Sequence, residues 1–114
     1  MKLLFIISKG LEKAGSAIRA MQFAALAAQQ GNPVEVFLID EAVHWAQGMR
    51  AAHGEGLTDY TALLSTPESP VRVCQPCAEK RLISQDKLIA GAVIAPVPML
   101  VEKMASPEYK VFTF

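Results

Sequence analysis

Val71-Arg72-Val73-Cys74-Gln75-Pro76-Cys77-Ala78-Glu79-Lys80-Arg81 is the stretch around which the chain is organised. It predicts a short apolar strand that ends at Cys74, followed by a helix with Pro76 in its first turn. Proline is well tolerated there, because the N–H that it lacks would have no partner anyway. This order places the Cys74 sulfur at the positive end of a helix, which lowers a thiol pKa. The sequence therefore predicts a reactive thiolate at Cys74.

Apolar runs bounded by polar or glycine-containing segments predict five strands, over residues 2–8, 34–39, 71–74, part of 87–95, and 109–114. Helical segments are predicted between them, over residues 16–30, 57–64, 75–82 and 96–104, with a short helical turn at 42–46 and a mobile loop at 49–56. Strands that alternate with helices pair in parallel through right-handed crossovers. We therefore expect a single three-layer α/β domain over residues 1–114, with a five-stranded, mainly parallel sheet of flavodoxin-like topology.

The carboxyl ends of these strands are where such a sheet gathers ligands and reactive groups. The segments that fall at those ends are Ser8-Lys9, Asp40-Glu41, Cys74 and Ala95-Pro96. His44 and Trp45 follow the second strand, and either the imidazole supports the thiolate or the pair shields the sheet end. Lys9 either adds positive charge near the thiolate or is a solvated loop lysine.

Cys77 gives the chain a Cys-x-x-Cys pair, and three interpretations stay open. The two thiols form a dithiol that closes to a disulfide, Cys77 resolves a persulfide, or Cys77 only packs against the sheet. A closed zinc site would need His44 and His53 as well, whose spacing lies outside the usual ligand pattern, so no metal is predicted. The glycines match neither phosphate-binding fingerprint, so no cofactor is predicted.

The composition limits the classes of partner. Hydrophobic residues make up 52% and charged residues 19% of the chain, below the roughly 25% charged of an average domain. Partner subunits that cover apolar surface are therefore expected. The 11 basic and 11 acidic residues balance, which gives no electrostatic reason to expect nucleic acid or an anionic membrane. The N-terminal apolar run stops at Ser8-Lys9 without a cleavage site, and we expect a cytoplasmic protein.

Three stretches resemble the DsrE/DsrF-like (YchN-like) proteins of sulfur relay. They are the opening strand and Ala-rich helix with Phe23-Ala24 and Gly31, the segment Val34-Glu35-Val36-Phe37-Leu38-Ile39-Asp40-Glu41-Ala42-Val43, and Val73-Cys74 leading into Ala78-Glu79-Lys80-Arg81-Leu82-Ile83. The resemblance implies a persulfide carrier that passes sulfur between donor and acceptor proteins, with Cys74 as the carrier. It also implies a trimer or hexamer, alone or with related subunits. Leu82 stands where family members often have glycine.

Three functions remain in competition at this point. The first is sulfur transfer on Cys74, and the second is dithiol redox chemistry that uses Cys74 and Cys77 together. The third is a non-catalytic subunit that uses the fold only as an interaction surface.

Overall fold

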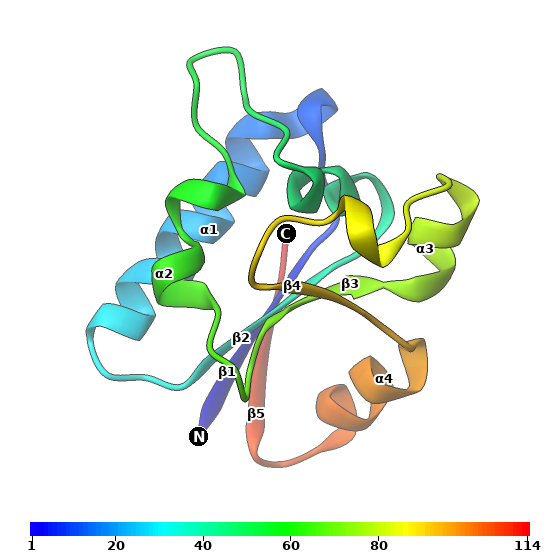
Figure 1. Ribbon diagram of the computed structural model, residues 1–114. Helices are drawn as coiled ribbons and strands as arrows, with labels where there is room; N and C mark the ends of the chain where they lie inside the picture. The colour runs from blue at the N-terminus through cyan, green and yellow to red at the C-terminus, as the bar shows by residue number, and fades with distance from the viewer.

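The computed structural model describes all 114 residues and contains one five-stranded sheet (Figure 1). The strands are β1 (Lys2–Ile7), β2 (Val34–Leu38), β3 (Val71–Cys74), β4 (Ala92–Ala95) and β5 (Tyr109–Thr113). Every strand pair is parallel. The predicted α/β fold with a five-stranded parallel sheet is confirmed.

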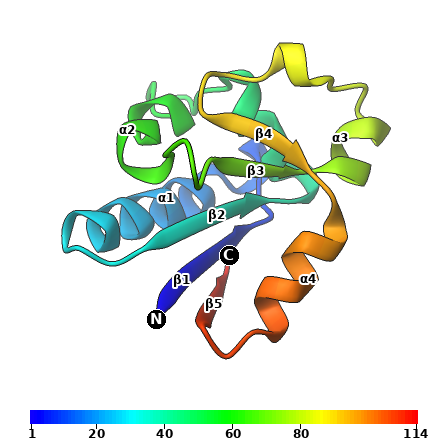
Figure 2. The same cartoon turned by 60° about the horizontal axis from the view of Figure 1, so that its bottom comes forward.

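The order of the strands is β4-β3-β2-β1-β5, which corrects the flavodoxin-like topology expected from the sequence. Flavodoxin-like sheets follow the order 2-1-3-4-5. Here the first four strands lie in space as they follow in sequence, and β5 returns to the free side of β1. Right-handed crossovers that step in opposite directions lie on opposite faces of a sheet. Accordingly, α1 (Ala14–Gln29) and α2 (Thr61–Leu64) cover one face and α4 (Val97–Ala105) covers the other (Figure 2).

Aromatic and small side chains build the core between the sheet and α1. Phe5 of β1 stacks on Phe112 of β5, with ring centroids 5.2 Å apart, and on Phe114 at 6.0 Å. Phe23 of α1 meets Phe114 edge to face. The residues of α1 that are buried are mostly small: Ala17, Ile18, Ala20, Met21, Ala24 and Ala25. Small residues let the helix lie close to the sheet, which buries the apolar strands.

The helix that follows Cys74, α3 (Gln75–Lys80), is two residues shorter than predicted. Leu82 adopts a left-handed backbone conformation, with φ 56°. The N–H of Leu82 donates to the carbonyl of Glu79, and the N–H of Ile83 donates to the carbonyl of Ala78. This pair of bonds is a Schellman motif, which favours glycine at the position that Leu82 occupies.

Four short 3₁₀ helices complete the connections. They are η1 (Leu11–Lys13), η2 (Asp40–Gln47), η3 (Leu57–Asp59) and η4 (Gln85–Lys87). The helix predicted over residues 57–64 is therefore divided into η3 and α2. The helical turn predicted at 42–46 is the longer η2. None of the helices has the length and apolar character that a membrane span requires.

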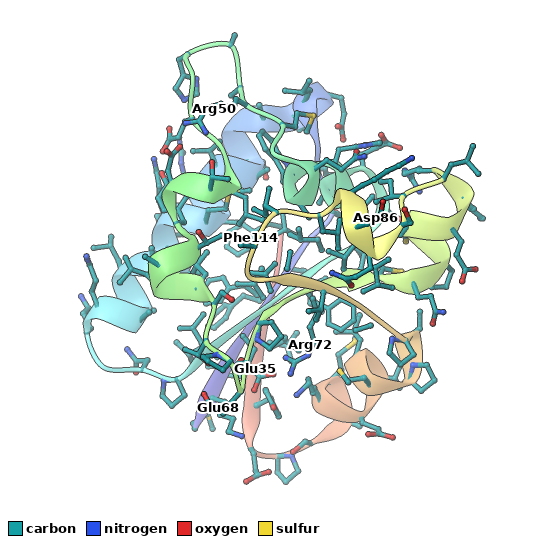
Figure 3. The ribbon with its side chains drawn as sticks, viewed as in Figure 1. Glu35, Arg50, Glu68, Arg72, Asp86 and Phe114 are labelled. Atoms are coloured by element: carbon teal, nitrogen blue, oxygen red, sulfur yellow. The ribbon has the colours of Figure 1, made fainter.

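The segment over residues 49–56, expected to be a mobile loop, is held in place by Arg50. An isolated antiparallel bridge joins Arg50 to Gly56. The Arg50 guanidinium donates to Thr58 Oγ1 at 2.7 Å and to both carboxylate oxygens of Asp59, at 3.0 and 2.8 Å (Figure 3). Because one side chain satisfies several partners across the loop, the segment has a defined conformation.

An ionic cluster lies on the α4 face of the sheet, around Glu35 of β2. The Glu35 carboxylate accepts from Arg72 of β3 at 3.1 Å, from Lys103 of α4 at 2.8 Å and from the Tyr109 hydroxyl at 2.7 Å. Glu35 is only 7% exposed. A buried carboxylate requires such partners, because a charge without them is costly to bury. The cluster joins α4 to three strands.

Candidate functional site

The site lies at the carboxyl end of β3, where Cys74 pairs with Ala95 of β4. The connection that leaves β3 runs on the α1 and α2 side of the sheet, whereas the chain that leaves β4 enters α4 on the opposite side (Figure 2). Adjacent strands whose connections leave toward opposite faces create the crevice in which α/β proteins place their chemistry. Cys74 is therefore at the topological switch point, as the sequence predicts for the reactive edge.

Cys74 and Cys77 are two free thiols at the start of α3. Cys74 is the residue immediately before α3 and is only 4% exposed. Cys77 lies one helical turn later and is half-buried. Cys77 is among the groups that shift the pKa of Cys74, so the two thiols are neighbours. Neighbouring thiols at the first turn of a helix are the arrangement in which a bound sulfur can be exchanged or a disulfide can close.

The pKa of Cys74 corrects the prediction of a lowered value. Burial is the main cause that raises the pKa of this thiol from an ordinary 9.0 to about 11. The side-chain hydrogen bond with Cys77 raises it further, the N–H of Cys77 lowers it, and the charges of Cys77 and Asp40 raise it. A single N–H at the start of a six-residue helix does not outweigh the loss of water. Cys74 is therefore a neutral thiol near neutral pH.

Asp40 places a backbone N–H against the second thiol. Its N–H donates to the Sγ of Cys77 at 3.3 Å. Asp40 has φ 50°, a left-handed conformation that few non-glycine residues adopt. This conformation lies at the point where the chain leaves β2 and enters η2. The carboxyl ends of β2 and β3 thus both contribute to the surroundings of Cys77.

Arg81, which the sequence pattern indicates either as part of the exposed face of the third helix or as a residue that orients an acceptor, lies in the site. Its guanidinium donates to the Cys77 carbonyl at 3.0 Å and to Glu41 Oε1 at 2.6 Å. The bond to Arg81 lowers the pKa of the Glu41 carboxyl. Arg81 therefore links the helix that carries Cys77 to the segment that carries Asp40. Two features of the sequence could have pointed to Arg81. It lies four residues after Cys77 on the same helical segment, and the acidic pair Asp40-Glu41 follows the neighbouring strand β2.

His44, Trp45 and Lys9, also predicted at this edge, have partners other than the thiols. The His44 ring contacts Gln47 at 2.9 Å and Glu41 at 3.6 Å. Trp45 is fully buried and donates its indole N–H to the Lys9 carbonyl at 2.8 Å, which fits the shielding interpretation. The charges that act on Cys74 include neither His44 nor Lys9.

No metal site or deep pocket surrounds the cysteines. The structure brings together no group of three His, Cys, Asp or Glu side chains that could hold a metal ion. Two surface hollows of about 430 and 380 Å³ lie at the amino end of the sheet and between α1 and α2, and neither includes a cysteine. Small-molecule sites are usually concave. The thiol pair lies instead at the carboxyl end of β3 and the start of α3, outside both hollows.

Comparison with known families agrees with this architecture. The DsrE/DsrF-like family model matches residues 1–114, the whole of the chain. The chain belongs to the DsrE/DsrF-like family. The resemblance inferred from the sequence is thereby confirmed.

Relatives of this DsrE/DsrF-like chain include two uncharacterized archaeal proteins. One, from Methanocaldococcus jannaschii, is 32% identical over 107 residues, which cover 89% of this chain and 90% of the relative. The other, from Methanopyrus kandleri, is 28% identical over 106 residues, which cover 90% and 84%. Both therefore share nearly the full domain.

Solved structures show the same fold. The crystal structure of the YchN protein from E. coli matches with a TM-score of 0.85 at 23% identity, covering 100% of this chain and 99% of that one. A protein of unknown function from Methanobacterium thermoautotrophicum matches with a TM-score of 0.69 at 11% identity, covering 99% and 98%. The predicted YchN-like architecture is thus confirmed at the level of fold.

Proposed function

We propose that this protein is a sulfur carrier that holds sulfur as a persulfide on the pair Cys74 and Cys77 and passes it to a partner protein. The DsrE/DsrF-like family is associated with sulfur relay. The observation that carries the proposal is the pair of neighbouring free thiols at the start of α3, at the switch point of the sheet. By the family motif, the sulfur that leaves for the acceptor is held on Cys74.

The chemistry is an exchange of sulfur–sulfur bonds. A thiolate of the pair attacks the outer sulfur of a donor persulfide, R–S–SH. The donor S–S bond breaks, R–S⁻ leaves, and a cysteine persulfide forms, so that nothing is oxidised or reduced overall. In the release step, a thiolate of the acceptor attacks the outer sulfur of the cysteine persulfide and the S–S bond breaks. The carrier cysteine leaves and takes up a proton, which restores the neutral thiol that burial favours at Cys74.

Partner proteins are the second part of the proposal. The donor and acceptor are proteins, because the thiol pair lies at the carboxyl end of β3, outside both surface hollows. The chain also works as a trimer or hexamer, alone or with related subunits. Exposed Phe23 and Leu26 on α1 and Leu63 on α2 support this, since clustered apolar side chains favour an interface. Both cysteines are free, which suits a reducing cytoplasm.

Dithiol redox chemistry is the alternative that one observation favours. Cys74 and Cys77 are both free and stand three positions apart at the start of α3, which is the Cys-x-x-Cys spacing at which redox proteins join two sulfurs. In that case the protein cycles between dithiol and disulfide and holds no extra sulfur. Cys77→Ser would then abolish activity altogether.

A cyanolysis assay tests the proposal. The protein is loaded with inorganic polysulfide, freed of excess reagent and treated with cyanide, which converts sulfane sulfur to thiocyanate. We expect thiocyanate from the wild type and from the control Lys80→Ala, which alters an exposed residue of α3. The double variant Cys74→Ser/Cys77→Ser should release none. Equal release from the double variant, or none from the wild type, would overturn the sulfur-carrier proposal.

A further inference from the structure

The geometry points to Cys77 as the thiol that first accepts sulfur, with Cys74 as the buried residue to which the sulfur then moves. This inference rests on the proposed function and assigns an order to its two cysteines. It departs from the family motif, which by itself identifies only Cys74. The exposure of Cys77 and its contacts with Asp40 and Arg81 carry the assignment.

Access is the first difference between the two sulfurs. Cys74 is 4% exposed, and it lies at the end of β3 in register with Ala95. Cys77 is half-buried, one helical turn farther from the sheet. A donor protein must bring its own sulfur into line with the attacking sulfur. Cys77 has more open surface than Cys74 for that approach.

A backbone donor is the second difference. The N–H of Asp40 points at Cys77 Sγ from 3.3 Å, and it comes from η2 rather than from the helix of the cysteine itself. A hydrogen-bond donor aimed at a sulfur stabilises the negative charge that develops on that atom when it attacks or leaves. The N–H is fixed by the left-handed backbone of Asp40, with φ 50°. The Asp40 N–H can therefore donate to the Cys77 sulfur both before and after the sulfur exchange.

Arg81 is a positioning residue for this contact. It binds the carbonyl of Cys77 at 3.0 Å and the carboxylate of Glu41 at 2.6 Å, and Glu41 directly follows Asp40 in the chain. Arg81 therefore connects the backbone of Cys77 to Glu41, and the neighbour of Glu41, Asp40, donates its N–H to the Cys77 sulfur. A planar guanidinium can make both bonds at once, which a single amine cannot do with the same geometry. Arg81 thus fixes the distance between the sulfur and its donor.

Transfer within the pair completes the sequence. The thiolate of Cys77 attacks the outer sulfur of R–S–SH, and R–S⁻ leaves. The Cys74 sulfur then attacks the outer sulfur of the Cys77 persulfide, while the proton of Cys74 passes to the departing Cys77 sulfur. One S–S bond breaks and one forms in each step, with no net oxidation. Attack on the inner sulfur would instead release hydrosulfide and leave a disulfide.

Time-resolved mapping of sulfur on the full-length protein tests the order. The wild type is mixed with inorganic polysulfide, quenched at short times with an alkylating reagent that traps persulfides, and digested for mass spectrometry. We expect the earliest persulfide on Cys77 and a later rise on Cys74. Cys77→Ser should slow the loading of Cys74 by about tenfold or more, because the remaining thiol is buried. Cys74→Ser should still load Cys77 at the wild-type rate.

The outcomes separate this inference from the proposed function. Sulfur that appears first on Cys74, or unchanged loading of Cys77→Ser, would overturn the order while leaving the carrier intact. No persulfide on either residue of the wild type would overturn both. Arg81→Ala should reduce the fraction of early sulfur found on Cys77, with its melting temperature measured beside it, whereas Lys80→Ala should not. An unchanged fraction in Arg81→Ala would remove Arg81 from the assignment.

Discussion

The backbone N–H of Asp40 donates a hydrogen bond to the sulfur of Cys77 across 3.3 Å, although the two residues are 37 positions apart in the chain. This contact joins the carboxyl ends of two neighbouring strands. It also places a carboxylate beside the thiol pair, since the charge of Asp40 raises the pKa of Cys74. Asp40 therefore has two opposite effects on the thiol pair. Its backbone N–H donates to the Cys77 sulfur, whereas its carboxylate disfavours negative charge on Cys74.

Asp40→Asn separates these two contributions. Asparagine keeps the N–H and tolerates the left-handed backbone, but it removes the negative charge. Because Asp40 is among the causes that raise the Cys74 pKa toward about 11, the variant should lower that pKa. The alkylation rate of Cys74, measured in a Cys77→Ser background, should then reach its midpoint at a lower pH. The control Glu79→Gln removes an exposed charge that does not act on Cys74, and a shift of the same size there would refute the explanation.

Leu82→Gly should stabilise the fold. Leu82 is 81% exposed and has φ 56°, so its side chain gains little from burial while its backbone is strained. The left-handed conformation costs a non-glycine residue about 1–2 kcal/mol, and the greater freedom of unfolded glycine offsets part of that. We expect a net gain of about 0.5–1 kcal/mol in the free energy of unfolding, measured in urea. Leu82→Ala keeps the strain and should show no gain; equal stability of the two variants would contradict the argument.

Glu35→Gln should destabilise the protein at neutral pH. The substitution leaves Arg72 and Lys103 without their carboxylate, and removal of one partner from a buried ion pair is strongly destabilising. The side chains of Arg72 and Lys103 keep 12% and 17% exposure, so we expect a loss of about 3 kcal/mol in the free energy of unfolding, the low end for a buried pair that loses one partner. Glu68→Gln, at an exposed acid, should cost almost nothing.

The same carboxylate predicts a dependence on pH. Burial opposes the ionisation of Glu35, but hydrogen bonds from Lys103 and Tyr109 and the charges of Lys103 and Arg72 outweigh it and lower its pKa below 4.5. A carboxyl with a lowered folded-state pKa contributes stability above about pH 4.5 and loses it as the pH falls through the folded value. The difference between wild type and Glu35→Gln in urea should therefore shrink in acid. A difference that stays constant down to pH 3 or so would contradict this account.

Leu26→Glu tests the proposed contact between subunits. Leu26 is 53% exposed on α1, so a charge there should leave the folded chain intact. A charge buried at an apolar interface is costly, and the variant should therefore shift a trimer or hexamer toward the 12.3 kDa monomer in light scattering. Glu12→Gln, at an exposed residue of η1, is the control. An unchanged mass of the Leu26 variant would exclude this part of α1 from the interface.

The strand pattern of the sequence predicted most of the fold, because buried strands such as Val71–Cys74 show as apolar runs between turn residues. The spatial order of the strands was not predictable in this way. Nothing local to Tyr109–Thr113 says on which side of the sheet that strand will pair. The end of α3 was missed for a similar reason, since Leu82 takes a backbone conformation that leucine rarely adopts.

The sequence predicted where Cys74 lies in the fold, but it did not predict the direction in which the pKa of Cys74 is shifted. The position of Cys74 followed from the strand and helix pattern, but its burial depends on Ala95 and Cys77, which only the folded chain brings into contact. The prediction of a lowered pKa counted the helix end and left out the loss of water. Arg81 was missed because its partner Glu41 is 40 residues away.

Intact-mass measurement after loading with polysulfide tests the central claim most directly. The account predicts that the wild type gains one sulfur atom per chain, that dithiothreitol removes it, and that digestion places it on the peptide that contains Cys74 and Cys77. The double variant Cys74→Ser/Cys77→Ser should gain nothing under the same conditions. A wild type that only loses two hydrogens to a Cys74–Cys77 disulfide, or a double variant that gains as much sulfur as the wild type, would contradict the account.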